Sequence, residues 1–403
     1  MRKPAPIRVA FVNTHPIQYF APLYAYLHGT GEFSVTALYL SDYSIRGAAD
    51  RGFERVVQWD IDLLAGYDAR FVEGAGRRNA PDGFFSYLAP HLWHDVRGGG
   101  FDAVVVHGHT PAAMLVAAAA AKVAGIPVFM RGETHLGLKR SRMKGLLRQP
   151  VMGALYRRFD GVLAIGSANA AFYRAMGVPE RNVFSMPYTV DNARFHAASQ
   201  FRDPERAAQR ARLGVSDDRP VVLFAAKFQA RKRPADLIRA AAHLVEAGIL
   251  FHVVMVGSGE SEAALRILCR DLGLESVHFA GFVNQDAMPR VYAACDLFVL
   301  PSDNEPWGLA INEAMCAGLP IVASSELGCV PDLVHEGVNG RLFPAGDVRG
   351  LSDALRPLLT DPEMRWRMGA ASRDIISRWS YAECREGLRA AVAAVGGRAP
   401  LAG

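Results

Sequence analysis

Short runs of hydrophobic residues alternate along the whole chain with segments of helical periodicity. Runs that are apolar at nearly every position are typical of parallel strands covered by helices on both faces. In the first half, this pattern predicts strands at 7–13, 33–40, 101–107, 127–131 and 161–165. In the second half, it predicts strands at 221–228, 252–256, 277–282, 297–301 and 320–324. Strands that alternate with helices in this way indicate βαβ units and doubly wound sheets.

The two sets of strands are separated by a charged segment with little apolar periodicity, residues 197–219, which we interpret as a linker that contains a short helix. We therefore predict an α/β fold with one Rossmann-like domain at 1–196 and a second at 220–380. In one helix of the first domain, Ser167 is a candidate N-cap and Gly177 a candidate C-terminal glycine. Because ligands bind beyond the carboxyl ends of strands in such sheets, we expect the active site in a cleft between the domains.

Composition narrows the class of protein. Half of the 403 residues are hydrophobic and 21% are charged, which is typical of a globular protein and excludes a disordered or low-complexity chain. The net charge of +5 is too small to predict a nucleic-acid partner. The N-terminus lacks a signal-peptide pattern, and the longest apolar stretch, 111–130, is interrupted by Lys122 and Gly125, so we expect a cytoplasmic protein. The five cysteines include no C-x-x-C pair and fit free thiols in a reducing compartment.

The segment 300–323 reads LPSDNEPWGLAINEAMCAGLPIVA and places two acidic residues, Glu305 and Glu313, eight positions apart. A helix is predicted to begin near Pro306 or Trp307. Glu305 would then lie on the preceding loop, and Glu313 about two turns into the helix. The free backbone N–H groups at the start of that helix form a ready anion site. We predict this site at Gly308, Leu309 and Ala310.

This segment resembles the E-x7-E signature of the retaining nucleotide-sugar glycosyltransferases with the GT-B fold, most closely glycosyltransferase family 4. The resemblance implies two Rossmann-like domains that face each other across a cleft, with a C-terminal helix at 381–403 returning to the first domain. It also implies that Glu305 positions the transferred sugar and that Glu313 binds the nucleoside ribose.

Three further segments are similar to the family in the same order. Lys227 and Lys232 occupy the place of the loop that holds the donor diphosphate, although Arg231 and Arg233 flank it and leave open which later cation reaches the phosphate. The strand ending Val-Gly-Ser-Gly supplies Gly257 to the donor site. The segment at Phe282 is similar to the one whose backbone reads the base. We therefore predict Lys227, Lys232, Gly257 and Phe282 as donor-binding residues.

The first half resembles a bacterial subgroup with His-Pro-Ile-Gln-Tyr after the first strand, at 15–19, in place of the family's usual Gly-Gly pair. His15 and Gln18 are acceptor-side candidates because they follow a strand's carboxyl end, although His15 is equally compatible with a loop or cap role. His109 and Arg131 are candidates for the same reason. Glu133 stands where relatives often carry a histidine near the reacting sugar, and we predict a catalytic role for it.

Two other patterns have competing interpretations. Asp60 and Asp62 form a D-x-D pair, which can hold a divalent metal in other proteins but which we interpret as structural here. His107 and His109 could be two metal ligands, but no third ligand follows at metal-site spacing, so we predict no metal site. The stretch 139–158 interleaves cations with apolar residues. It can lie on an anionic membrane surface, or it can be a helix with a solvated basic face.

The function that the resemblance implies is transfer of a sugar from a nucleoside-diphosphate sugar, with UDP or GDP as the carrier, to a hydroxyl acceptor. No obligatory cofactor or metal is expected, and the resemblance implies a role in the synthesis of surface polysaccharide, glycolipid or other glycoconjugates. The cytoplasmic protein would contact the inner face of the membrane if 139–158 binds lipid. A nucleotide-sugar epimerase on the same fold and a non-catalytic nucleotide-sugar-binding protein remain as alternatives, and the sequence predicts no oligomeric state.

Overall fold

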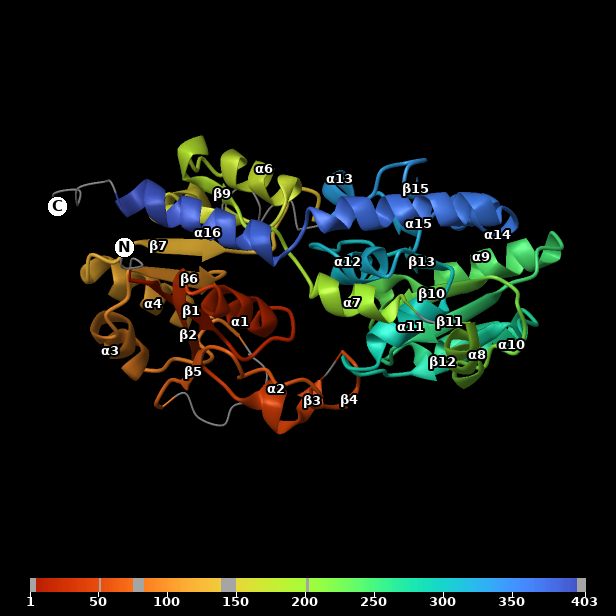
Figure 1. Cartoon of the computed structure of the whole chain (residues 1–403), viewed down its shortest axis with the longest axis horizontal. Helices are drawn as coiled ribbons and strands as arrows, with labels where there is room; N and C mark the ends of the chain where they lie inside the picture. The colour runs from red at the N-terminus through yellow and green to blue at the C-terminus, as the bar shows by residue number, and fades with distance from the viewer. Residues whose placement is uncertain (1–4, 51, 75–82, 139–149, 201–202, 397–403) are drawn as a thin grey trace. The chain divides into compact units, whose positions relative to one another are not determined.

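The computed structural model describes residues 5–50, 52–74, 83–138, 150–200 and 203–396, which form two compact units (Figure 1). Unit 1 comprises the described residues of Met1–Ala49, Val56–Tyr188 and Tyr381–Gly403. Unit 2 comprises those of Asp50–Arg55 and Thr189–Ser380. Each unit has its own sheet and its own hydrophobic core.

Unit 1 is built on a seven-stranded sheet in the order β5-β2-β1-β6-β7-β8-β9, with parallel pairing between neighbours. Its strands are β1 (Ile7–Asn13), β2 (Phe33–Tyr39), β5 (Asp68–Phe71), β6 (Ala103–His107), β7 (Val128–Arg131), β8 (Gly161–Ala164) and β9 (Val183–Ser185). Its helices are α1 (Ala21–Gly29), α2 (Tyr43–Arg46), α3 (His91–Gly98), α4 (Ala112–Val123), a helix that includes 150–156, α6 (Ser167–Ala175) and α16 (Tyr381–Gly396), with a 3-10 turn at Glu180–Asn182. A small two-stranded sheet pairs β3 (Ala48–Asp50) with β4 (Arg55–Val57).

Both faces of the unit 1 sheet are covered because successive side chains of a strand point to opposite faces. On one face, Ala10 and Val12 of β1 belong to a buried core that includes residues of α3, α4 and α6. On the other, Phe11 stacks on Tyr24 of α1, with ring centroids 4.4 Å apart. This arrangement explains why the central strands are apolar at almost every position, and it confirms the predicted doubly wound architecture for this unit.

Unit 2 repeats the design with a six-stranded parallel sheet in the order β12-β11-β10-β13-β14-β15. Its strands are β10 (Val221–Ala225), β11 (His252–Val256), β12 (Val277–Gly281), β13 (Leu297–Leu300), β14 (Ile321–Ser324) and β15 (Gly340–Phe343). Its helices are α7 (Asn192–Ala198), α8 (Asp203–Arg212), α9 (Pro234–Glu246), α10 (Glu262–Asp271), α11 (Met288–Ala294), α12 (Leu309–Cys316), α13 (Val330–Leu333), α14 (Val348–Thr360) and α15 (Pro362–Ser377), with a 3-10 turn at Ala230–Lys232. Two parallel Rossmann-like units of this kind confirm the predicted fold class.

The helices of unit 2 pack on both faces of its sheet. Leu297 and Val299 of β13 lie in a core shared with α9, α10 and α14. Phe298, which points the opposite way, packs against Tyr292 of α11 at a centroid distance of 5.8 Å. Local chemistry sets where two of the helices begin, because Asp347 accepts a hydrogen bond from the backbone N–H of Gly350 and Asp361 accepts one from Met364.

The division of the chain differs from the predicted domain boundaries. The second segment of unit 1 ends at Tyr188, earlier than the predicted limit of 196, and the predicted linker 197–219 contains helix α8. This helix is part of unit 2 because Arg206 and Arg210 donate to the Asp296 carboxylate at 2.8 and 2.6 Å. A short helix was predicted in this segment, but its charged surface gives little apolar periodicity, so the sequence did not indicate that it belongs to a domain.

The C-terminal helix α16 packs against β9 and α1 within unit 1, and the Cys384 thiol donates to the carbonyl of Pro187 at 3.1 Å.

The predicted N-cap of helix α6 at Ser167 is wrong, because Ser167 is the first helical residue and Gly166 takes the cap position. Gly177, with a φ of +81°, does follow the end of this helix as predicted.

Candidate donor site and acceptor pocket

Glu305 is the centre of an ion cluster in unit 2, and its side chain is buried while that of Arg231 is exposed. Its carboxylate accepts hydrogen bonds from the ammonium of Lys232 and, at 3.2 Å, from the guanidinium of Arg231. Both cations come from the turn after β10, and Glu305 comes from the loop between β13 and α12. Burial lowers the pKa of Lys232, and the neighbouring Glu305 carboxylate acts in the opposite direction. The structure thus brings the predicted pair Lys232 and Glu305 into direct contact.

Helix α12 begins at Leu309, later than the predicted start near Pro306 or Trp307. Gly308 takes the N-cap position with a φ of +103°, a conformation that glycine adopts without strain. The N–H groups of Gly308, Leu309 and Ala310 therefore lie at the start of the helix, where its dipole favours an anion. Further along, the buried Glu313 carboxylate accepts a hydrogen bond from the Tyr292 hydroxyl at 2.7 Å.

Lys227 has a different partner from Lys232. Its ammonium donates to both oxygens of the Asp50 carboxylate, at 2.8 and 3.0 Å, and lies 4.6 Å from the ring centroid of Phe53. Burial acts to raise the pKa of Asp50, but Lys227 and two backbone N–H groups outweigh it, so the pKa is lowered. Arg233 forms ion pairs with Asp236 and Asp303 instead of joining the Glu305 cluster.

The two remaining donor-site candidates lie at the carboxyl ends of β11 and β12. Gly257 has a φ of +134°, and a Cβ there would come within 2.1 Å of the carbonyl oxygen of Ala226. Gly257 follows β11 and Ala226 follows β10, so the close approach of the ends of these two strands requires glycine. Its N–H donates to the carbonyl of Gly281 at 2.9 Å. The ring of Phe282 packs edge-to-face against Phe53, with centroids 4.9 Å apart, and the guanidinium of Arg55 lies over it at 4.7 Å.

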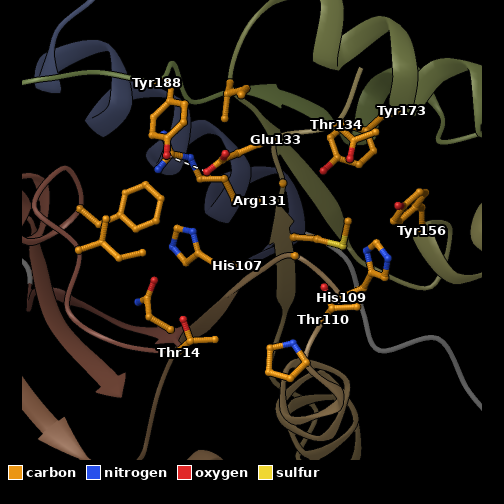
Figure 2. Close-up of a pocket in the computed structure, with 18 of the residues that line it drawn as sticks. Thr14, His107, His109, Thr110, Arg131, Glu133, Thr134, Tyr156, Tyr173 and Tyr188 are labelled. Carbon is orange, nitrogen blue, oxygen red and sulfur yellow. Dashed lines mark hydrogen bonds between the residues drawn. The ribbon is translucent and has the colours of Figure 1, made fainter. Parts of the chain in front are cut away.

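Unit 1 contains a pocket of about 610 Å³ at the carboxyl ends of β1, β6 and β7. Figure 2 shows Arg131, Glu133 and Tyr188 on one side of it and His109 and Tyr156 on another. The Tyr188 hydroxyl donates to the Glu133 carboxylate at 2.7 Å. The structure therefore gathers three of the predicted residues, His109, Arg131 and Glu133, around one pocket.

Arg131 supplies the positive charge of this pocket. It is 3% exposed, donates to the carbonyl of Pro187 at 2.9 Å, and lies over the rings of Phe20 and Tyr188. Its Nε and Nη1 atoms are buried without a hydrogen-bond partner. Burial, together with the charge of Arg131, holds the pKa of His107 well below its usual value, so this histidine is neutral. His107 instead exchanges a hydrogen bond with the hydroxyl of Tyr24 at 2.8 Å.

Only some residues of the loop after β1 line the pocket. Asn13, Thr14, Ile17 and Phe20 line the pocket. His15 faces Tyr43, with its Nε2 3.0 Å from the Tyr43 hydroxyl. His15 and Gln18, both predicted for the acceptor side, are thus not among the residues that line this pocket.

The remaining patterns that the sequence analysis considered are the acidic pair Asp60 and Asp62, the possible metal ligands and the basic stretch 139–158. The Asp62 carboxylate accepts a hydrogen bond from the N–H of Leu64 in its own loop at 2.9 Å. Among the described residues, no three His, Cys, Asp or Glu side chains come together in a way that could hold a metal ion. In the predicted basic stretch, 139–149 lies outside the described residues, while Arg157 and Arg158 are exposed. Within the described ranges, every helix is too short or too polar to span a bilayer.

Several residues of these sites were not indicated by sequence reasoning. Tyr188 and Tyr292 orient Glu133 and Glu313, and each lies far from its partner in the chain. Asp50 and Phe53 contact Lys227 from a segment more than 170 positions away. The sequence of 50–55 contains acidic and aromatic residues, and this did not single out a partner.

Comparison with known proteins agrees with this division of the chain. The family model for "Glycosyl transferases group 1" matches residues 205–375, and that for the "Glycosyl transferase 4-like domain" matches residues 17–189. A D-inositol 3-phosphate glycosyltransferase of Saccharomonospora viridis is 35% identical over 50% of this chain and 49% of its own. Another, from Thermobifida fusca, is 29% identical over 96% of this chain and 93% of its own. The first of these alignments spans about half of the relative's length.

The fold is shared with solved structures. The structure of HepE from Anabaena in complex with UDP and glucose is similar with a TM-score of 0.73 and 20% identity, over 96% of this chain and all of the other. WaaG, a glycosyltransferase involved in lipopolysaccharide biosynthesis, is similar with a TM-score of 0.68 and 16% identity, over 96% of this chain and all of the other. The chain therefore has the GT-B fold of these solved structures, and its two halves match domain models of glycosyl transferases, the 4-like domain at 17–189 and group 1 at 205–375.

Proposed function

We propose that the protein is a retaining glycosyltransferase that moves a sugar from a nucleoside-diphosphate sugar to a hydroxyl acceptor. The observation that carries this proposal is the cluster of the buried Glu305 with Lys232 and Arg231 beside the N-terminus of α12. A diphosphate at this position meets two cations and the positive end of a helix, and a carboxylate lies within reach of sugar hydroxyls. Glu305 positions the sugar and Glu313 binds the ribose.

In this mechanism, the bond between the anomeric carbon and the diphosphate oxygen breaks while the acceptor oxygen bonds to the same face of the sugar. The proton of the acceptor hydroxyl passes to the departing diphosphate oxygen. The charge that develops on the diphosphate is stabilised by Lys232, Lys227 and the N–H groups at the start of α12. The protein contributes positioning and charge stabilisation, so we propose that the reaction needs no metal.

The unit 1 pocket is the proposed acceptor site. Its lining combines a buried cation, Arg131, with a carboxylate, Glu133, and the His109 ring, a set that can hold a polyhydroxyl compound through several hydrogen bonds. Glu133 would act close to the oxocarbenium-like centre, with Tyr188 fixing its orientation. We propose that the acceptor belongs to surface polysaccharide, glycolipid or other glycoconjugate synthesis at or near the cytoplasmic face of the membrane.

UDP and GDP are the proposed donor carriers. The structurally similar HepE is described in complexes with UDP and with UDP-glucose, which makes UDP the first diphosphate to test. The test is a thermal-shift screen with UDP, GDP, ADP and TDP, with and without magnesium. A diphosphate at a hundred times its dissociation constant adds about 2.7 kcal/mol to the free energy of unfolding, which raises the melting temperature visibly.

Matched lysine variants make the screen specific. Lys232→Ala should abolish the response, whereas Lys122→Ala, which removes a surface ion pair with Asp160 in unit 1, should leave it intact. The bound diphosphate then identifies the sugars for a transfer assay that follows release of the diphosphate. Stabilisation without transfer to any hydroxyl acceptor would favour a binding protein, and conversion of the sugar without an acceptor would favour an epimerase. Stabilisation by no diphosphate would contradict the proposed donor site.

A further inference from the structure

Asp50 and residues 52–55, here called the strap, lie on the residues proposed to bind the donor. They belong to unit 2 by their contacts, although the chain enters and leaves them from unit 1. The Asp50 carboxylate takes two hydrogen bonds from the ammonium of Lys227. A carboxylate with both oxygens on one ammonium resembles a phosphate group in charge and in hydrogen bonding.

The strap also covers the glycine-rich loop after β11. The Ser258 hydroxyl donates to the carbonyl of Phe53 at 2.8 Å. A Cβ on Gly259 would come within 2.9 Å of the carbonyl oxygen of Gly52, and a Cβ on Gly52 would come within 2.6 Å of Lys227. Two glycines, one on each side of the contact, therefore permit a backbone approach that side chains would block.

Phe282, the proposed base-reading residue, is covered by the same segment. Phe53 packs on it edge-to-face, and the Arg55 guanidinium lies 4.7 Å from its ring centroid. The strap thus supplies an anion at Lys227 and an aromatic ring at Phe282, which are the two chemical features of a nucleoside diphosphate. Glu54, at the tip, has a φ of +52°, a conformation that is strained for a residue other than glycine.

We propose that the strap is an intramolecular competitor of the donor, which must leave Lys227 and Phe282 before a nucleoside diphosphate can bind there. This inference rests on the proposed function, since it assumes that Lys227 and Phe282 hold the donor. The apparent dissociation constant for the donor is then the intrinsic one divided by the fraction of molecules in which the strap is undocked. It also keeps Lys227 paired and the glycine loop covered until the donor arrives.

Isothermal titration of the full chain with UDP and with GDP tests the competition. Asp50→Asn keeps the shape of the side chain and removes its charge, so the dissociation constant should fall about tenfold, equivalent to ~1.4 kcal/mol. Phe53→Ala should act in the same direction. The matched control Asp374→Asn removes an exposed carboxylate that pairs with Arg378 on α15, and it should leave the affinity unchanged.

The outcomes separate this inference from the proposed function. Weaker or unchanged binding in Asp50→Asn, with binding still lost in Lys232→Ala, would overturn the competitor and leave the donor site standing. Absence of binding in every variant, with folding confirmed by circular dichroism, would overturn both. A second readout is tryptic cleavage after Arg55, followed by mass spectrometry. It should accelerate when the diphosphate that binds is added, and protection of this bond instead would also overturn the competitor.

Discussion

The ammonium of Lys232 donates a hydrogen bond to the carboxylate of Glu305, although the two residues are 73 positions apart in the chain. Their side chains are only 12% and 11% exposed. The pair holds the turn after β10 against the loop before α12, so it has a structural role in addition to the proposed role in donor binding.

This double role predicts a separation of stability from activity. Lys232→Met leaves the Glu305 carboxylate buried with one cation fewer, and the free energy of unfolding should fall by about 3 kcal/mol. The double variant Lys232→Met/Glu305→Leu should recover most of this loss, because no buried charge is left without its partner. Transfer activity should stay reduced by about 100-fold or more in both proteins. Chemical denaturation and a transfer assay measure the two effects, and recovery of activity in the double variant would contradict the site.

Gly257 should be among the least replaceable residues of unit 2. A Cβ at this position collides with the carbonyl of Ala226, so Gly257→Ala should force the ends of β10 and β11 apart. Gly248→Ala is the matched control, since Gly248 also has a positive φ, +80°, but open space around its Cβ position. We expect thermal unfolding to show a clearly larger loss for Gly257→Ala, and equal losses would show that backbone strain alone accounts for the effect.

Helix α8 should contribute to the stability of unit 2. Arg210→Ala removes a buried charged hydrogen bond to Asp296, and the expected loss is about 2–3 kcal/mol in the free energy of unfolding. Arg212→Ala, at an exposed position of the same helix, is the control and should change little. If 203–212 were a loose linker, the two variants would unfold alike in urea.

The neutral His107 predicts an acid-sensitive unit 1. Burial lowers its pKa in the folded protein, while the unfolded chain has a histidine pKa of about 6.5. Below that value the unfolded state binds more protons, so the stability contribution of His107 is present above it and is lost as the pH falls.

The measurement is the melting temperature between pH 7.5 and pH 5. His107→Gln, which keeps a polar partner for Tyr24, should flatten the decline relative to the native protein. His243→Gln, at an exposed position of α9, serves as the control and should leave the decline unchanged. Identical curves for the native protein and His107→Gln would rule out the proposed source of the acid sensitivity.

The hydrophobic pattern predicted the sheets because their central strands are buried on both faces. Strands β1 and β11 have the predicted bounds for this reason. The short edge strands β5, β9 and β15 were not predicted, because strands such as β9, with three residues of intermediate or high exposure, leave no apolar run to detect. A short helix was predicted between the two sets of strands, where α8 lies, but the ionic contacts that join it to unit 2 were not predicted.

The candidate site was predictable only where its residues lie in one motif. The spacing of Glu305 and Glu313 indicated a loop residue followed by a helix residue, and the structure has this arrangement. Partners that come from distant segments, such as Tyr188 for Glu133 and Asp50 for Lys227, depend on tertiary contacts that one sequence does not encode in any local pattern.

Helix α16, the last described element of the chain, packs on strand β9 and helix α1 of unit 1. During synthesis, unit 2 therefore emerges from the ribosome before the final piece of unit 1 exists. Chains usually fold from the N-terminus as they are made. Here unit 1 is begun first but completed last. Until α16 has been translated, the surface of β9 and α1 that it covers in the folded protein stays exposed.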